Sequence, residues 1–368
     1  MFEILYIDGK ARVGKLKTAH GFVETPFLMP VATRGTVKYI SPLDLEECGA
    51  DAIICNSLIL HLKLKDEFIK EFGSLHKFIG YKKTIFTDSG GFQMQTPSLF
   101  LGISDKKVQF KNPFTYQKTS ISPEDSMRIQ LNLGSDVAMC LDHMPHTKQN
   151  YDEWVEATKR THLWAERCKK EHDKLKGNSK QLLFGIAQGG LDKELRRKSA
   201  EFINNLDFDG VAMGGLCLGE SKEAMFAAID HQIPVFNPEK PRYLMGVGTP
   251  TDLIEAVSHG ADCFDSKFPT QNARHANLFT SEGMLKLDKG IYAKDNSPID
   301  KNCKCFVCKN FSRAFLRHLY MLKDFTVYRY LSYHNIFYTQ NLMKEMRKSI
   351  KEGEFEKFKK ELIKKYQK

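Results

Sequence analysis

The sequence contains no run of 18 consecutive apolar residues, so no transmembrane helix is expected. Its amino terminus lacks the basic segment followed by an apolar stretch that characterises a secretory signal peptide. The nine cysteines are an odd number in a chain of 368 residues, which argues against a secreted disulfide framework. Together these absences indicate a cytoplasmic protein.

Acidic residues are scarce at one end of the chain. Residues 301–368 contain 17 Lys and Arg but 6 Asp and Glu, a balance of +11. The other 300 residues contain 38 Lys and Arg and 39 Asp and Glu, a balance of −1, so the overall charge is +10. A neutral body with a basic end indicates a polyanion that docks at that end. A solvated, lysine-rich helix over 351–368 is an equally good explanation for that part of the excess.

A short apolar run that ends in polar or glycine-rich residues recurs eight times. The runs are 27–33, 52–56, 84–91, 137–142, 183–190, 210–215, 243–248 and 261–265. Continuous apolar runs suit strands that are buried on both faces of a parallel sheet, and a helical stretch follows each run. Eight strand–helix units predict an α/β protein with a (β/α)8 TIM barrel, whose active site lies at the carboxyl ends of the strands.

Four metal-binding side chains lie close together near the end of the sequence. Cys303, Cys305 and Cys308 stand within six residues, and His334 follows 26 residues after the last cysteine (334 − 308 = 26). Three thiolates and one imidazole suit tetrahedral Zn²⁺ and leave no open position for a reactive water. We therefore predict one structural Zn²⁺ per chain, which ties the basic C-terminal helices to the barrel.

Three segments do not fit the eightfold repeat. Residues 1–25 contain the hairpin signal Asp8-Gly9 and predict a small antiparallel flap, and 93–120 predict an insertion after the third strand. Residues 276–300 predict short strands and turns, and amphipathic helices are expected over 311–322 and 333–346, with His334 early in the second. The predicted domains are a catalytic barrel, 1–275, and a zinc-binding, basic helical subdomain packed on it, 276–368.

Carboxylates stand at the ends of two apolar runs. Asp88 precedes Ser89-Gly90-Gly91 after the third run, and Asp265 ends the eighth. Either acid alone is equally well explained as a helix cap. Two acids on one barrel face, about 5 Å apart, are the arrangement for double displacement at a sugar anomeric carbon. One acid would then attack the sugar, and the other would protonate the leaving group.

Other strand ends supply groups that can recognise a purine. Asp142 and Gln188 offer a carboxylate and an amide for the donors and acceptors of a purine edge, and 214–216 offer backbone groups. Phe92 and Met245 are suited to sandwich a flat ring. Spacing alone, however, favours ordinary core positions for both of these apolar side chains.

Several segments occur together as motifs. They are Asp88-Ser89-Gly90-Gly91-Phe92-Gln93, Gly185-Ile186-Ala187-Gln188-Gly189-Gly190, Gly214-Gly215-Leu216, the run 242–248, Phe264-Asp265 with Pro269-Thr270, and the Cys-x-Cys-x2-Cys…His tetrad. In this order, over nearly the whole chain, they resemble tRNA-guanine transglycosylase. The interval of 26 residues before the histidine is similar to that of the bacterial branch.

The resemblance implies a pentosyltransferase of queuosine biosynthesis. Such an enzyme exchanges guanine at the wobble position of tRNAs with GUN anticodons for a 7-deazaguanine, in bacteria usually 7-aminomethyl-7-deazaguanine (preQ1). It implies Asp265 as the nucleophile, through a covalent Asp265–ribose intermediate, and Asp88 as the general acid and base. It also implies a homodimer in which one subunit catalyses while the other helps to hold the tRNA.

Three sets of binding residues also follow from the resemblance. The substrate base would be bound by Asp88, Ser89, Gly90, Gly91, Phe92, Asp142, Gln188, Gly215, Leu216 and Met245. The RNA around the anticodon would be contacted by Gly246, Val247, Gly248, Thr249, Pro250, Thr251, Asp252, Thr270, Gln271, Asn272, Ala273 and Arg274. Zn²⁺ would be bound by Cys303, Cys305, Cys308 and His334.

The sequence departs from the bacterial pattern at a few positions. Ser266 follows the nucleophile in place of a cysteine, and Gln271 replaces an arginine, so one anticodon contact loses the charge and fork of a guanidinium. Met144 and Leu218 stand where the usual pocket has cysteine and valine. Leu218 would fill the region that enzymes acting on the bulkier queuine open, so preQ1 is favoured and queuine is the alternative. Glu220 keeps its place, where it is thought to help read the 7-substituent.

Two rival functions share these features. The first is a paralogue that inserts a 7-deazaguanine into DNA, which would carry the same carboxylates and zinc. The second is a non-catalytic tRNA-binding partner subunit, as occurs in eukaryotic relatives. The presence of both Asp88 and Asp265 argues against the second rival. Electrostatic steering by the basic end predicts salt-dependent tRNA binding. Neutralising Lys357, Lys359 and Lys360 is then expected to weaken binding more than turnover.

Overall fold

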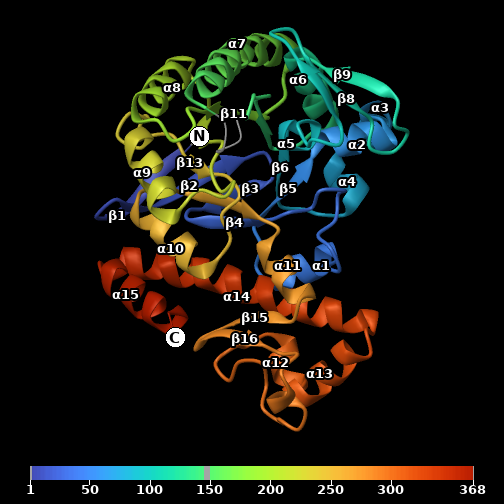
Figure 1. Cartoon of the computed structure of the whole chain (residues 1–368), viewed down its shortest axis with the longest axis vertical. Helices are drawn as coiled ribbons and strands as arrows, with labels where there is room; N and C mark the ends of the chain where they lie inside the picture. The colour runs from blue at the N-terminus through green and yellow to red at the C-terminus, as the bar shows by residue number, and fades with distance from the viewer. Residues whose placement is uncertain (1, 145–149, 368) are drawn as a thin grey trace.

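The eight predicted apolar runs form one parallel sheet that closes into a barrel (Figure 1). The structure is a computed structural model that describes residues 2–144 and 150–367. The strands are β4 (Phe27–Pro30), β5 (Ala52–Asn56), β6 (Thr84–Asp88), β10 (Val137–Met139), β11 (Leu182–Ala187), β12 (Gly210–Met213), β13 (Arg242–Leu244) and β14 (Cys263–Ser266). Their order is β4-β14-β13-β12-β11-β10-β6-β5. A hydrogen bond from the Ala32 amide to the Ile54 carbonyl (2.7 Å) joins β4 to β5, so the predicted barrel is confirmed.

The helices between the barrel strands, and one helix after the last strand, lie outside the barrel (Figure 1). They are α1 (Pro42–Glu47), α2 (Ser57–Leu64), α3 (Asp66–Phe72), α4 (Leu75–Ile79), α5 (Gly91–Met94), α6 (Pro123–Leu133), α7 (Tyr151–Leu175), α8 (Lys193–Asn205), α9 (Lys222–Gln232), α10 (Pro250–Ser258) and α11 (Phe268–Arg274). Polar caps define where several of them begin; Ser122, for example, forms a capping box with Asp125 at α6. Among the described residues, no helix is long and apolar enough to cross a bilayer.

The inside of the barrel is filled by side chains from the strands themselves. Phe86 and Phe184 meet there edge to face, with ring centroids 5.7 Å apart, and Met139 and Tyr243 belong to the same buried cluster. The apolar runs are continuous because alternate residues face this interior and the surrounding helices. A substrate can therefore reach the barrel only at an end of the strands.

The N-terminal flap covers the amino-terminal end of the barrel. Its strands are β1 (Phe2–Asp8), β2 (Ala11–Thr18) and β3 (Gly21–Glu24), which pair in antiparallel order as predicted. Arg12 binds Asp262, which precedes β14, with a distance of 2.8 Å from Nε to Oδ1. His20 binds Asp136, which precedes β10, at 2.8 Å. Because the flap contacts the starts of the strands, the open end of the barrel is the one formed by their carboxyl ends.

The predicted insertion after β6 is a second antiparallel sheet. Its strands are β7 (Phe100–Ile103), β8 (Val108–Lys111) and β9 (Lys118–Ile121). The indole of Trp164 in α7 donates a hydrogen bond of 2.7 Å to the Asp105 carbonyl and anchors the insertion to the helix. The sheet therefore stands beside the outer helices and is not part of the barrel.

The C-terminal segment forms a lobe beside the barrel. It consists of β15 (Asn277–Thr280), β16 (Gly283–Lys286), a 3-10 turn (Gly290–Tyr292), α12 (Phe306–Asn310), α13 (Arg313–Met321), α14 (Phe325–Lys351) and α15 (Phe355–Tyr366). The last predicted helix is wrong in its bounds, because α14 starts eight residues before Tyr333. Asp324 caps this start and no helix breaker follows before Gly353, so His334 lies well inside the helix.

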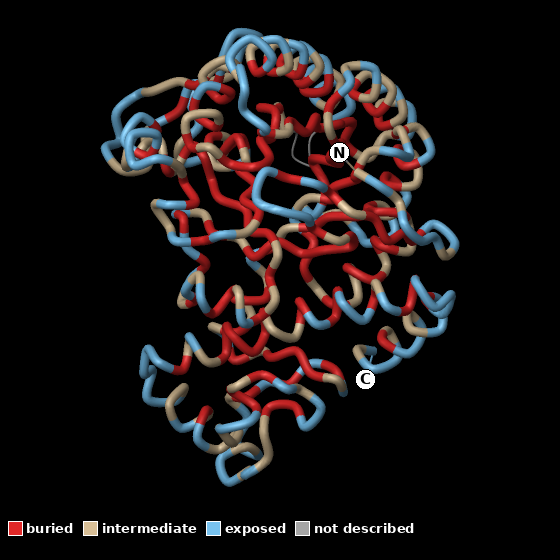
Figure 2. Tube along the Cα trace, turned by 180° about the vertical axis from the view of Figure 1, so that it is seen from behind, coloured by how far each residue is buried: buried red, intermediate tan, exposed pale blue. Residues whose placement is uncertain are grey.

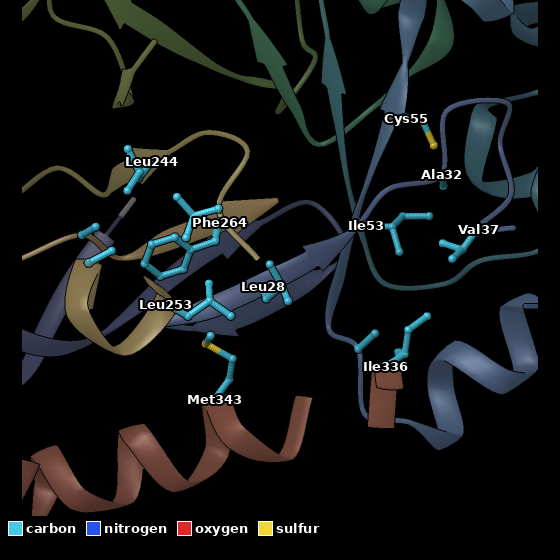
Figure 3. Packing of buried hydrophobic residues seen from close by; sticks show 14 of the residues in the cluster. Leu28, Ala32, Val37, Ile53, Cys55, Leu244, Leu253, Phe264, Ile336 and Met343 are labelled. Atoms are coloured by element: carbon cyan, nitrogen blue, oxygen red, sulfur yellow. The ribbon is translucent and has the colours of Figure 1, made fainter. Parts of the chain in front are cut away.

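Helix α14 lies between the barrel and the part of the lobe formed by β16, α12 and α13 (Figure 1). Its barrel-facing side chains are buried, and Figure 2 shows alternating buried and exposed segments along it. Met343 and Ile336 from α14 belong to the same apolar cluster as Leu28, Leu253 and Phe264 of the barrel (Figure 3). The lobe therefore shares a continuous hydrophobic core with the barrel instead of forming a separate one.

Candidate active site

A cavity of about 430 Å³ opens at the carboxyl ends of the barrel strands. Nine of the ten residues predicted to bind a base line it: Asp88, Ser89, Gly90, Gly91, Phe92, Asp142, Gly215, Leu216 and Met245. The tenth, Gln188, is fully buried and reaches the cavity through Asp142. Asp265 lines the same cavity. The strand ends thus bring together residues that are up to 177 positions apart in the chain (265 − 88 = 177).

Asp265 is held at the end of β14 by two hydrogen-bond donors. The Tyr243 hydroxyl donates to its Oδ1 at 2.6 Å, and the Gly246 amide donates to the same oxygen at 2.9 Å. Burial raises the pKa of Asp265, and these two hydrogen bonds offset part of that rise. The two donors therefore orient the carboxylate and favour its anionic form against the effect of burial, and a nucleophile requires that form.

Asp88 ends β6, where the glycines after it allow a sharp turn. The Gly90 amide, from a residue with φ of +77°, donates to its Oδ1 at 3.0 Å. Burial, followed by the charge of Asp265, raises the pKa of Asp88 to about 7. A carboxyl group that titrates near neutral pH can give a proton to a leaving group and take one from an incoming group. The two acids are thus placed in unequal environments within one cavity.

Asp142 and Gln188 form a second polar pair in the cavity wall. Gln188 Nε2 donates to Asp142 Oδ2 at 2.6 Å, and burial raises the pKa of Asp142 to about 6. Gln188 Oε1 is buried and has no hydrogen-bond partner in the described part of the chain. A carboxylate and an amide side by side match the polar edge of a purine.

The two predicted stacking residues differ in exposure. Phe92 is 54% exposed at the cavity, which rules out the alternative that it is an ordinary core residue. Met245 packs partly against the cluster inside the barrel and also lines the cavity. An exposed aromatic ring beside a polar cavity is available for stacking on a flat ligand.

The residues that depart from the bacterial pattern also gather here. Met144, Leu218, Ser266 and Gln271 all line the cavity. Glu220 does not line it but accepts hydrogen bonds from the Cys217 and Leu218 amides, the latter at 2.9 Å. The Glu220 carboxylate therefore shapes the loop that presents Leu218 to the cavity.

The two predicted RNA-binding segments are only partly accessible. Gly246, Thr249, Thr251, Asp252, Gln271, Asn272 and Arg274 are exposed or half-buried, whereas Val247, Gly248, Pro250, Thr270 and Ala273 are buried. Some of the accessible side chains already have partners, because Thr249 caps α10, Asp252 forms an ion pair with Lys222 and Asn272 donates to the Phe268 carbonyl. The accessible members lie beside the cavity, since Gly246 and Gln271 line it.

The predicted zinc ligands converge in the C-terminal lobe. His334 Nδ1 lies 3.7, 3.6 and 3.3 Å from the sulfur atoms of Cys303, Cys305 and Cys308. Ligands about 2.0–2.3 Å from a tetrahedral ion are separated by roughly 3.5–3.8 Å, so this cluster fits Zn²⁺. His334 Nε2 donates to the Phe279 carbonyl at 2.8 Å, which leaves Nδ1 to face the thiolates. Four protein ligands would leave no open position on a bound ion, as in structural zinc sites.

Three residues of the site were not identified from the sequence. Tyr243 binds the nucleophile candidate, Asn56 lies against Asp88 and lowers its pKa, and Arg196 lies behind the cavity wall. The Tyr243 hydroxyl could have been noticed as a polar group in an apolar run. Asn56 could have been noticed as the polar end of the run 52–56, whereas Arg196 carries no such signal because it lies in a charged helix.

Comparison with known proteins agrees with this geometry. A family model described as "Queuine tRNA-ribosyltransferase" matches residues 8–368. The chain is 44% identical over 368 residues to the queuine tRNA-ribosyltransferases of Francisella tularensis subsp. tularensis (strain SCHU S4 / Schu 4) and subsp. novicida (strain U112), covering 99% of this chain and 98% of each relative. The resemblance in the motifs is therefore confirmed. The chain belongs to the queuine tRNA-ribosyltransferase family of tRNA-guanine transglycosylases.

Proposed function

We propose that this transglycosylase exchanges guanine at the wobble position of GUN-anticodon tRNAs for a 7-deazaguanine, with preQ1 as the physiological base. One observation carries the proposal: Asp265 and Asp88 line one cavity, the first held by two donors and the second with a pKa near 7. Double displacement at an anomeric carbon needs this pairing of an oriented anion and a proton donor.

In the first half of the reaction, Asp265 attacks C1′ of the ribose. An oxygen–carbon bond forms, and the bond between C1′ and the purine nitrogen breaks with its electron pair moving to the purine. Protonated Asp88 gives its proton to the departing guanine. The resulting ester retains the energy of the glycosidic bond, so the exchange needs no ATP.

In the second half, the incoming base attacks the same carbon. Asp88, now a carboxylate, accepts the proton that the incoming ring nitrogen loses, and Asp265 leaves as a carboxylate. Water in the cavity would hydrolyse the ester and leave an abasic site. The base that fills the cavity must therefore also exclude water from C1′.

Recognition of the purine falls to the other cavity residues. Asp142 and Gln188 provide hydrogen bonds to the polar edge, and Phe92 and Met245 lie available to stack on the ring. The wobble base must leave its stack to enter, which is least costly in a single-stranded anticodon loop. This requirement favours tRNA over duplex DNA as the substrate.

The choice of preQ1 rests on how much space the side chains of the cavity wall leave for the 7-substituent. Leu218 and Met144 both line the cavity, and the loop with Leu218 is held by Glu220. Two large apolar side chains leave less room than the cysteine and valine of the usual pattern. A bulky cyclopentenediol substituent, as in queuine, would have to displace one of them.

A homodimer is the proposed assembly. Apolar side chains are exposed at the end of α13 and the start of α14: Met321 is 55% exposed, Leu322 65% and Phe325 75%. Such a group on the zinc-binding lobe supports a protein contact. Light scattering of the wild type and of Phe325→Lys would test it. We expect a mass near twice 42.2 kDa for the wild type and a shift toward the monomer for the variant.

Two experiments test the proposed reaction. Wild-type protein incubated with GUN-anticodon tRNA is expected to form a covalent adduct that hydroxylamine cleaves, and Asp265→Asn is expected to form none. A competition of guanine, preQ1 and queuine for one tRNA then identifies the base. Preferential labelling of duplex DNA would refute the tRNA assignment, and an adduct formed by Asp265→Asn would refute the nucleophile.

A further inference from the structure

Behind the cavity wall lies a fully buried arginine, Arg196 of α8, that the reaction described above does not use. Its guanidinium binds three backbone carbonyls. Nε donates to Gly190 at 2.7 Å, Nη1 to Gly214 at 2.7 Å and Nη2 to Gly215 at 3.5 Å. Arg196 forms no ion pair among residues 2–144 and 150–367. A buried cation held only by carbonyls is costly, so its position calls for an explanation.

The carbonyls that Arg196 binds belong to the loops that end β11 and β12. In a trans peptide the carbonyl and the next amide point in opposite directions. When the Gly214 carbonyl points at Arg196, the Gly215 amide points away from it. Gly214, Gly215 and Leu216 line the cavity, and Arg196 does not. Arg196 therefore turns the amides of this loop toward the place that the base would occupy.

The loop is packed closely around Gly215. Gly215 has a φ of +68°, and a Cβ placed there would lie 2.4 Å from Gln188 Oε1. Such tight packing excludes a side chain but does not by itself decide which way the peptide faces. Peptides next to glycine can flip at low cost, because both orientations are sterically open. Two donors of one rigid guanidinium, which bind the Gly214 and Gly215 carbonyls, supply the preference.

Arg196 remains positively charged although it is buried. Burial lowers the pKa of Arg196 to about 9, which still leaves the guanidinium protonated at neutral pH, and the charge of Glu220 opposes the decrease. Gln232 adds a weaker contact, with its Oε1 at 3.4 Å from Nη1. Positive charge behind a peptide carbonyl polarises that peptide and strengthens its amide as a donor.

We propose that Arg196 is a positioning residue for purine recognition, which fixes the Gly215 amide as the donor to the 6-oxo group of the base. The inference rests on the proposed function, since it assumes a guanine-like base in the cavity. It assigns the 6-oxo group to the loop that Arg196 holds and the 2-amino edge to Asp142. The two edges can then be perturbed separately.

The test measures base selectivity in Arg196→Lys. Inhibition constants of guanine, 6-thioguanine and hypoxanthine are compared in the tRNA exchange assay. 6-Thioguanine weakens the acceptor at position 6, and hypoxanthine lacks the 2-amino group. A lysine has one nitrogen where arginine has three, so it cannot hold both loops. We expect the preference for guanine over 6-thioguanine to fall about fivefold and the preference over hypoxanthine to stay unchanged.

Selectivity ratios do not depend on how much of the variant is folded, so a loss of stability cannot imitate this result. Arg197→Lys is the matched control, because Arg197 lies on the surface and pairs with Glu194 and Glu201. If Arg196→Lys is insoluble, Gln232→Leu replaces it, with the same selective change expected at about twofold. Equal loss of both preferences, or no change in either, would overturn the proposal. A wild type that does not discriminate among these bases would instead refute the proposed function.

Discussion

Tyr243 and Asp265 share the shortest side-chain hydrogen bond that the nucleophile candidate makes, 2.6 Å from hydroxyl to Oδ1. The Gly246 amide binds the same oxygen at 2.9 Å. Both donors therefore occupy one oxygen, and Oδ2 is the oxygen with the freer lone pairs for attack at C1′. The tyrosine sits on β13, the strand that pairs with β14, so the barrel itself sets this geometry.

Tyr243→Phe is expected to impair the nucleophile without removing it. The hydrogen bond from Tyr243 lowers the pKa of Asp265 against the rise caused by burial, so its loss raises that pKa further. The acidic limb of the kcat/KM profile should move to higher pH, and kcat/KM at neutral pH should fall roughly 10- to 100-fold. Tyr81→Phe is the control, because the Tyr81 hydroxyl is also buried but binds the Ala50 carbonyl away from the cavity. An unshifted acidic limb in Tyr243→Phe would contradict the role.

Asp88 should produce a basic limb in the pH profile. Its pKa is raised to about 7, so the protonated form that serves the departing guanine is lost as the pH rises through that value. Turnover is expected to decline above about pH 7. Asp88→Asn should remove this limb and lower the maximum by roughly 10²- to 10⁴-fold. A full basic limb in Asp88→Asn would assign the titration to another group.

The same carboxyl group should cost stability at high pH. A folded pKa raised above the unfolded value means that stability is fully present below the unfolded pKa and is lost as the pH rises through about 7. Asp88→Asn is therefore expected to raise the melting temperature at pH 8 and to change it little at pH 4. Scanning calorimetry at both pH values measures the difference.

Asp66 offers a control of opposite sign. Burial raises its pKa, but hydrogen bonds from His61 and Asn132 outweigh burial, so the net pKa is lowered. Its contribution is present above the unfolded pKa and is lost only at low pH. Asp66→Asn should therefore lower the melting temperature at pH 8. If both variants shift in the same direction, burial does not dominate the titration of Asp88.

Removal of the metal should affect folding and not the chemical step. Cys308→Ser is expected to lower bound zinc from about one per chain to near zero and to lower the melting temperature, because the ligands link α12 to α14. The rate of adduct formation per folded molecule should stay unchanged. Cys48→Ser, which alters a buried cysteine outside the cluster, should keep its zinc. Adduct formation that depends on added zinc in folded protein would refute a purely structural ion.

The two groups of basic residues at the C-terminal end should differ in tRNA binding. Helix α15 begins beside the flap, where the Phe355 amide donates to Asp8, and Lys359 binds Glu255 of α10 at 2.8 Å. The zinc-binding part of the lobe is instead tied to α11 beside the cavity, since Asn335 of α14 donates to the Pro269 carbonyl at 3.0 Å. This part of the lobe thus lies nearer than α15 to the open end of the barrel.

Charge neutralisation can separate these groups. Lys301, Lys304 and Lys309 are exposed around the zinc ligands, and three lysines of α15 serve for comparison, the exposed Lys357 and Lys360 and the half-buried Lys359. We expect glutamine at the first three positions to raise the Kd for tRNA. The number of counterions released on binding, given by the slope of log Kd against log salt concentration, should fall by up to three. The basic end of the sequence led us to expect weaker tRNA binding from glutamine at the second three, but the main effect should instead be lower stability, because Lys359 binds Glu255. A larger loss of tRNA affinity in the α15 variant would place the RNA beside α15 and not beside the zinc ligands.

Much of the architecture follows from local patterns. Each apolar run with its polar end indicates one strand, so all eight barrel strands could be predicted, and turn signals indicated the flap. The start of α14 was missed because its first turns contain aromatic and β-branched residues with no clear apolar period. Packing against the barrel stabilises that segment, and sequence alone does not display such packing.

The sequence by itself determined which chemistry the protein carries: carboxylates and glycines at strand ends, three cysteines and a histidine at ligand spacing, and motifs of one enzyme family. Only the tertiary structure decided how these groups act. The approach of Tyr243 to Asp265, the raised pKa of Asp88 and the carbonyl contacts of Arg196 each join residues from different strands or helices. Closure of the barrel creates these contacts, because burial and electrostatic fields depend on what lies nearby in space and not on what is adjacent in the chain.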